Sequence, residues 1–142
     1  MSKCDVDRVT RLVARVLGIN GEFRGFQLEN WGEVDRGAEL SANAFIFVEV
    51  ECGQKHPSTN VLKVWPYLAK KKKLRVFLVQ CYLPKSQALG SSRQGLARWI
   101  GGKMEELLKN RFFYAEIMVS KDIVHKGALL KKFKRFEEIV RR

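Results

Sequence analysis

The sequence of 142 residues has few of the side chains from which small disulfide or zinc scaffolds are built. It contains three cysteines and two histidines, and no two cysteines form a Cys-x-x-Cys pair. Structural zinc sites need clustered Cys or His ligands, and disulfide scaffolds need a dense, even set of cysteines, so both classes are disfavoured. We therefore expect Cys4, Cys52 and Cys81 to be reduced, as in a reducing cytoplasm.

Long apolar runs are also missing. No stretch approaches the roughly 18 apolar residues that a membrane-spanning helix needs. The first ten residues, MSKCDVDRVT, lack the apolar segment of a signal peptide. We expect a cytoplasmic protein with no membrane partner.

Positive charge is present in excess. The chain has 27 Lys and Arg against 15 Asp and Glu, which gives a net charge of +12 and a pI near 9.9. A field of this sign attracts polyanions, nucleic acid before an anionic membrane. The length predicts a single domain over residues 1–142 with a substantial core.

The spacing of apolar residues predicts an α/β domain. A helix begins at Asp5 or Asp7 and ends at Gly18. Strands are predicted over 22–28, 33–41, 44–52, 74–83 and 112–119, and helices over 58–65, where Pro66 ends or kinks the helix, and over 93–110. Inward positions of the helix over 93–110 are predicted to be Leu96, Ile100, Met104, Leu107 and Leu108, with a break possible at Gly101 and Gly102 and with Trp65 and Trp99 as core residues. A basic C-terminal helix carries an apolar stripe of Leu129, Phe133, Phe136 and Val140. This order predicts a mixed sheet with helices on both faces.

Two carboxylates stand two residues apart in the most hydrophobic strand. Because strand side chains alternate between faces, Glu49 and Glu51 share one face while Val48 and Val50 share the other. Oxygen ligands at this separation suit Mg²⁺. A solvated second face is the alternative interpretation of the same pattern.

The preceding strand carries further acids whose position depends on the turn. A two-residue loop at Ala42 and Asn43 would place Glu39 opposite Ile46, on the wrong face. A longer loop or a bulge would place Glu39 beside Phe47 and Asp35 opposite Glu51. Asn60, Lys63 and Tyr67 recur at helical spacing and form a polar face after the loop.

The stretch GAELSANAFIFVEVECGQKHPSTNVLKVW resembles the PD-(D/E)XK, or restriction-endonuclease-like, nuclease superfamily. The resemblance implies a core in αβββαβ order over about residues 5–119, followed by a basic helical extension over 120–142. It places Glu39 as the first acid, with Asp35 as the alternative, and Glu49 as the second acid. Glu51 stands where the family's lysine usually stands, and Lys63, or else Lys55, is the candidate for a migrated lysine. By the same resemblance the Val50 carbonyl is an additional metal ligand, and Asp7 is a weak match to a metal-site acid on the first helix.

The resemblance implies a Mg²⁺-dependent nuclease, with Mn²⁺ as a substitute, that hydrolyses phosphodiester bonds in DNA. Endonuclease, resolvase, repair and restriction roles stay open, as do RNA as a partner and a homodimer. The alternative is a catalytically inactive nucleic-acid-binding or assembly module of the same fold. A third hypothesis is a basic subunit that docks through the C-terminal apolar stripe. Candidate contacts to the nucleic-acid backbone are Lys55, His56, Asn60, Lys70, Lys71, Lys72, Lys73, Arg93, Arg98 and Lys103.

Overall fold

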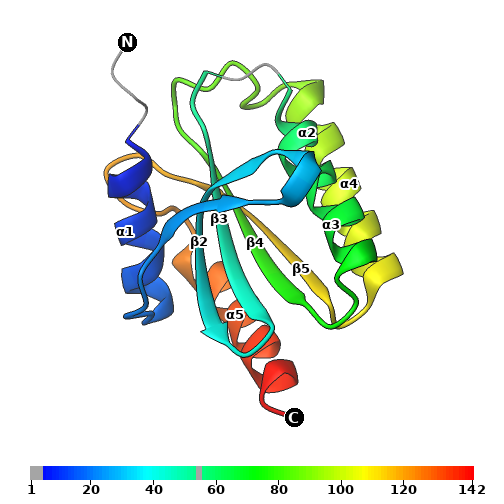
Figure 1. Cartoon of the computed structure of the whole chain (residues 1–142). Coiled ribbons are helices and arrows are strands. Elements are labelled where there is room, and N and C mark those ends of the chain that lie inside the picture. The colour runs from blue at the N-terminus through cyan, green and yellow to red at the C-terminus, as the bar shows by residue number, and fades with distance from the viewer. Residues whose placement is uncertain (1–4, 54–55) are drawn as a thin grey trace.

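The computed structural model describes residues 5–53 and 56–142, and it contains a mixed five-stranded sheet with helices on both faces (Figure 1). The strands lie in the order β1-β2-β3-β4-β5, antiparallel from β1 to β3 and parallel from β3 to β5. The predicted α/β class with a mixed sheet is confirmed. In chain order the elements are α1 Val6–Leu17, β1 Arg24–Gln27, the 3-10 turn η1 Glu29–Trp31, β2 Glu33–Ser41, β3 Ala44–Glu51, α2 Pro57–Leu62, α3 Val64–Lys70, β4 Arg75–Tyr82, α4 Ser92–Leu108, β5 Phe112–Met118 and α5 Lys126–Val140.

Turn residues end the first elements where the sequence predicts. Gly18 closes α1 in the left-handed conformation, with φ of 71°. Asn43 takes φ of 65° at the tip of the β2–β3 hairpin, a conformation that Asn tolerates better than most residues. The predicted end of a helix at Pro66 is wrong. The break falls at Lys63, and Pro66 is the third residue of α3, where an N–H has no partner within the helix and its loss costs nothing.

Each face of the sheet carries its own apolar cluster. One cluster joins Val9 of α1 to Ile46 and Val48 of β3 and to α5, and the other joins Phe47 of β3 to α2, α3 and α4. Figure 1 shows the same division, with α1 and α5 on one side of the sheet and α2, α3 and α4 on the other. The predicted alternation along β3 is therefore confirmed, but β3 is buried on both faces rather than solvated on one.

The apolar stripe of α5 belongs to the first of these clusters. Leu129, Phe133 and Phe136 are buried, and the ring of Phe77 in β4 lies 5.5 Å from that of Phe133. The hypothesis that this stripe docks on a partner is therefore wrong.

The buried face of α4 agrees only in part with the predicted one: Met104 is buried and Ile100 and Leu108 pack against the apolar cluster, as predicted. Leu96, Trp99 and Leu107 are 51–61% exposed, and the buried residues are Ala97, Gly101 and Met104. The helix runs through Gly101 without a break. A Cβ at Gly101 would lie 2.5 Å from the ring of Tyr114, so the missing side chain lets α4 approach β5 closely. The close approach at Gly101 therefore helps to decide which face of α4 is buried.

The structure bears on two sequence-based expectations, the reduced state of the cysteines and the lack of a membrane-spanning helix. Cys81 is a buried free thiol, whereas Cys52 is disulfide-bonded, so the expectation of reduced cysteines is wrong for Cys52. Cys4 lies outside the described residues. Within residues 5–53 and 56–142, no helix has the length and apolar character required to cross a membrane.

The two adjacent glycines of α4 provide a matched test of this packing. We expect Gly101→Ala to lower the free energy of unfolding by about 1–3 kcal/mol, because the new methyl group overlaps the Tyr114 ring. Gly102 has no atom within 4 Å of a built Cβ, so Gly102→Ala should raise stability by up to about 1 kcal/mol through helix propensity. Urea unfolding of both variants checks this, and equal effects at the two positions would contradict the close approach.

Candidate functional site

The polar side chains of interest gather where β3 and β4 end, on the face covered by α2. Arg36 of β2 pairs with Val48 of β3, so the preceding residue, Asp35, lies opposite Glu49. β3 and β4 run parallel and bring Gln80 beside Glu49 and Tyr82 beside Glu51. The carboxyl ends of parallel strands are the usual position of ligand sites in α/β folds.

The hairpin register decides between the two candidates for the first acid. A bulge between Glu39 and Ser41 places Glu39 opposite Phe45, and Glu39 is exposed. It lies four residues along β2 from Asp35, or roughly 13 Å. The preferred prediction, that Glu39 is the acid beside Glu49, is therefore wrong. The alternative acid, Asp35, lies opposite Glu49. The predicted pairing of Asp35 with Glu51 is also wrong, because Asp35 lies opposite Glu49, two residues earlier in β3.

Glu49 is almost completely enclosed, with 1% of its surface exposed. Its Oε1 accepts the backbone N–H of Asp35 at 3.2 Å and lies 2.8 Å from Lys63 Nζ. Burial, assisted by the negative charge of Asp35, raises the pKa of Glu49 to about 8 against the opposing effect of Lys63. Glu49 is thus a carboxyl whose one cationic neighbour does not offset its desolvation.

Lys63 reaches the site from the junction of α2 and α3. Its side chain is 11% exposed, and besides Glu49 its Nζ donates to the Glu33 carbonyl at 2.7 Å and to Asn60 Oδ1 at 3.1 Å. Of the polar face predicted from Asn60, Lys63 and Tyr67, the first two residues do meet, whereas Tyr67 is buried in the apolar cluster of α3. The ammonium group is surrounded by oxygens from β2, β3 and α2.

Glu51 is held by amides rather than by a cation. Asn60 Nδ2 donates to its Oε1 at 3.1 Å and to its Oε2 at 2.9 Å, and Gln80 Nε2 donates to Oε2 at 2.9 Å. Burial raises the pKa of Glu51, and these two donors act in the opposite direction. Asn60 therefore lies in the acidic site and not on an outer nucleic-acid-binding face.

Gln80 and Tyr114 are site residues that sequence analysis missed. The Tyr114 hydroxyl donates to Gln80 Oε1 at 2.5 Å, and Gln80 Nε2 also donates to the Pro57 carbonyl at 2.9 Å. These contacts fix the amide so that its N–H faces Glu51. The signal for Gln80 was present in the sequence, because it is the polar residue inside the buried run VFLVQCYL.

Asp35 is half-buried and also contacts β3. Its Oδ2 accepts the backbone N–H of Val50 at 2.8 Å, which orients the carboxylate toward the strand that carries Glu49. The Val50 carbonyl as a metal ligand stays a prediction. Asp7 does not join the site, because it pairs with Arg36 at 2.9 Å and α1 covers the opposite face of the sheet.

Most of the other predicted backbone contacts lie outside this cluster. Lys70 and Lys71 each pair with Glu29 at 3.0 Å. Arg98 pairs with Glu116 at 2.7 Å, and Lys103 with Glu106 at 3.4 Å. His56 and Arg93 are exposed, and Lys55 lies outside the described residues.

The donor atoms suit a hard cation in kind. Carboxylate oxygens of Asp35, Glu49 and Glu51 are the ligands that Mg²⁺ prefers, and the raised pKa of Glu49 indicates that another positive charge would stabilise its ionised form. Across the described part of the chain, no group of three or more His, Cys, Asp or Glu is already arranged as a metal site. The chemistry of the residues fits a cation, and the side chains would have to rearrange around it.

Comparisons with protein-family models, curated proteins and solved structures found no match to this chain.

The raised pKa of Glu49 has a measurable effect on stability. The folded-state pKa of about 8 lies above the ordinary value of 4.5, so between these two values the folded protein retains a proton that the unfolded chain releases. Raising the pH through this window therefore lowers the free energy of unfolding. Glu49→Gln removes this loss, so its stability advantage over the wild type should be small near pH 5 and grow to the order of a few kcal/mol near pH 8.

Urea unfolding at the two pH values, without divalent cations, measures this difference. Glu39→Gln is the matched control, because Glu39 is exposed and lies far along β2. An advantage of Glu49→Gln that is the same at both pH values would show that Glu49 titrates normally.

Proposed function

We propose that the chain is a metal-dependent nuclease of the restriction-endonuclease-like class that hydrolyses phosphodiester bonds in DNA. The observation that carries the proposal is the meeting of Asp35, Glu49 and Lys63 at the end of β3, with Lys63 Nζ 2.8 Å from Glu49 Oε1. Two acids from adjacent strands and a lysine from the next helix are the set that the sequence resemblance requires, with Asp35 in place of Glu39. The strand order and the mixed directions of the sheet are consistent with the same class.

The acids would hold Mg²⁺, or Mn²⁺ in its place. Asp35 and Glu49 supply carboxylate oxygens from facing strands, and the Val50 carbonyl and Glu51 are further oxygen donors in the proposal. When bound, such a cation polarises a phosphoryl oxygen and lowers the pKa of a coordinated water. Asn60 and Gln80 keep the Glu51 carboxylate in one orientation, and Tyr114 keeps Gln80 in place.

Lys63 supplies positive charge beside the reacting phosphate. Hydrolysis joins a water oxygen to phosphorus, breaks one ester P–O bond and gives the leaving oxygen a proton. The ammonium group would stabilise the negative charge that gathers on the phosphoryl oxygens during this exchange. Its contacts to Glu33 and Asn60 hold Nζ close to the two acids before substrate binds.

DNA is the proposed partner on electrostatic grounds. The net charge of +12 favours binding of polyanions such as DNA. The acidic cluster alone would repel a phosphodiester, so in the proposal a bound cation lies between the acids and the DNA. RNA is distinguished from DNA by the choice of substrate in the assay below. A homodimer would let two such sites cut two strands.

A cleavage assay tests the proposal directly. Plasmid, linear, single-stranded and branched DNA, and an RNA strand, are incubated with Mg²⁺, Mn²⁺ or chelator. We expect metal-dependent cutting that falls at least roughly 100-fold in Asp35→Asn and in Glu49→Gln, because each removes charge that positions the cation. DNA binding by both variants should be retained, since both reduce negative charge near the substrate.

Glu39→Gln is again the matched control, with the same chemical change on the same strand as Asp35. Its cutting rate should equal that of the wild type, because Glu39 is exposed and away from the cluster. Full activity in Glu49→Gln, or loss of activity in Glu39→Gln alone, would remove the site described here.

A catalytically inactive nucleic-acid-binding or assembly module is the second candidate. The observation that favours it is the position of the Lys63 ammonium, which contacts oxygens of Glu49, Glu33 and Asn60. A cation shared between these elements would compete for the same oxygens. In this proposal the lysine has replaced the metal, and the acids serve the fold.

Titration with Mg²⁺ distinguishes these two candidates. If the chain is a nuclease, the wild type binds Mg²⁺ through Asp35 and Glu49, and Lys63→Gln binds Mg²⁺ but cuts at least roughly tenfold more slowly. If it is an inactive module, Mg²⁺ binds only after Lys63→Gln removes the ammonium, and neither protein cuts. Calorimetry with Lys134→Gln as the control for lost surface charge makes the measurement, since Lys134 lies exposed on α5.

A further inference from the structure

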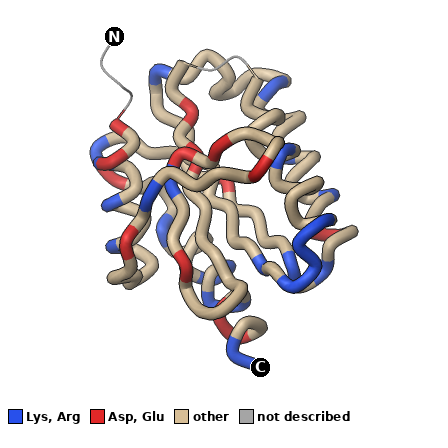
Figure 2. The backbone as a smooth tube through the Cα atoms, in the orientation of Figure 1, with Lys and Arg blue, Asp and Glu red and all other residues tan. Residues whose placement is uncertain are grey.

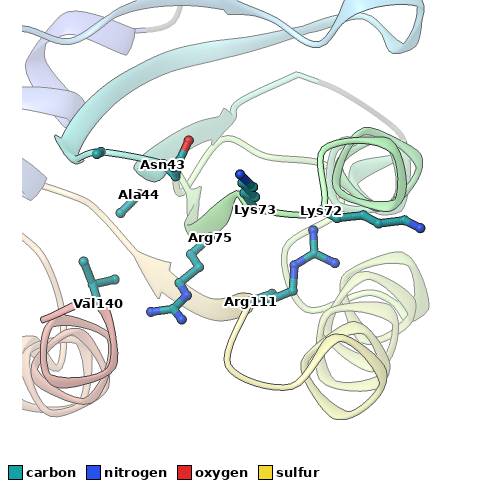
Figure 3. Close-up of a pocket in the computed structure, with 8 residues that line it drawn as sticks. Asn43, Ala44, Lys72, Lys73, Arg75, Arg111 and Val140 are labelled. Carbon is teal, nitrogen blue, oxygen red and sulfur yellow. The ribbon is translucent and has the colours of Figure 1, made fainter. Parts of the chain in front are cut away.

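A basic cavity lies at the opposite end of the sheet from the acidic site. It has a volume of about 410 Å³ and forms where the β2–β3 turn meets the segments that lead into β4 and β5 (Figure 3). Ala44 begins β3 beside Arg75 at this end, and Glu51 closes β3 beside Tyr82 at the other. Ala44 and Glu51 are seven positions apart along β3, or roughly 23 Å, so the cavity is separate from the acidic site.

The lining carries positive charge alone. Lys72, Lys73, Arg75 and Arg111 line the cavity together with small, amide and apolar residues, and no Asp or Glu is among the lining residues. Figure 2 shows Lys and Arg gathered at the segment between α3 and β4 that contributes to it. In the part of the chain that the structure describes, none of these four side chains is within ion-pair distance of a carboxylate, whereas the preceding Lys70 and Lys71 both pair with Glu29.

The two arginines are held in place by backbone carbonyls. Arg75 donates to the Ile139 carbonyl at 2.8 Å, near the end of α5. Arg111 donates through Nη2 to the carbonyls of Leu68 at 2.6 Å and Lys71 at 2.9 Å, and through Nε to the carbonyl of Leu74 at 3.3 Å. Carbonyl contacts fix a guanidinium group without cancelling its charge. Arg75 keeps its Nε and Nη2 donors for a two-donor contact, whereas Arg111 keeps only the two N–H donors of Nη1.

We infer that this cavity binds a phosphate group. Four like charges around one cavity repel each other even though their side chains point in different directions (Figure 3), and an anion with several acceptor oxygens relieves that repulsion. Arginine binds phosphate through two parallel N–H donors, and the neighbouring lysines add mobile positive charge at the rim. The inference does not rest on the proposed nuclease activity, because it uses none of the residues of the acidic site.

Such a phosphate has two chemical sources: a small phosphate compound or the backbone of a nucleic acid. Pyrophosphate is the probe for the first, and a short DNA duplex is the probe for the second. Both are titrated at constant ionic strength with chelator present, so that a divalent cation at the acidic site contributes nothing. The side-chain Nε–H resonances of Arg75 and Arg111 report where the probe binds.

The test variant is Lys72→Gln with Lys73→Gln, since both lysines are exposed and outside the core. Its matched control is Lys131→Gln with Lys134→Gln, an equal loss of charge at exposed positions of α5. Arg75→Lys keeps the charge but removes the two-donor geometry, and we expect it to weaken pyrophosphate binding as well.

We expect pyrophosphate to shift both arginine resonances, and the test variant to bind it at least roughly tenfold more weakly than the control variant does. If the duplex also binds, weakens in the same variant and is displaced by pyrophosphate, the source is a nucleic-acid backbone. If pyrophosphate binds and the duplex does not compete, the source is a small phosphate compound. Unshifted arginine resonances with both probes, or equal weakening in the test and control variants, would overturn the inference.

Discussion

The structure depends on the burial of two carboxylates at the end of its central strand. β3 is hydrogen-bonded on both edges and covered by helices on both faces, so Glu49 and Glu51 are withdrawn from water. A buried carboxylate is unfavourable unless cations or hydrogen-bond donors surround it. Lys63 meets this demand only in part for Glu49, and amide donors of Asn60 and Gln80 meet it in part for Glu51, so burial still raises the pKa of both carboxyls. The short helices α2 and α3 thus contact the sheet end both through these polar groups and through apolar packing.

A chain of contacts connects α4 to the acidic site. Gly101 lets α4 lie close to β5, which holds the Tyr114 ring beneath the helix. The Tyr114 hydroxyl holds Gln80, and Gln80 holds Glu51. Orientation of the site therefore depends on packing in a different layer, and a change in α4 can alter the site without touching an acid.

The two ends of the sheet carry opposite charges. Acids collect where β3 and β4 end, and unneutralised lysines and arginines collect where β4 and β5 begin. Figure 2 shows these acidic and basic regions apart in the fold. The net charge of +12 is therefore unevenly distributed. The acidic end of the sheet suits a cation, and the basic end suits an anion. The carbonyl contacts of Arg75 and Arg111 show that part of the basic end is built into the fold rather than spread over a flexible surface.

Local periodicity in the sequence determined the bounds of β2, those of β3 to within one residue, and the shared face of Glu49 and Glu51. It also placed Asn60 near Lys63, because helical spacing acts over a few residues. Tertiary structure alone decided what depends on distant contacts. A bulge near Ser41 set the register that chose Asp35 over Glu39, and parallel pairing brought Gln80 and Tyr114 to the acids. Glu29 of η1 pairs with Lys70 and Lys71, two of the four lysines of the run. These outcomes follow from register, close approach and long-range charge pairing, and no local pattern of residues specifies them.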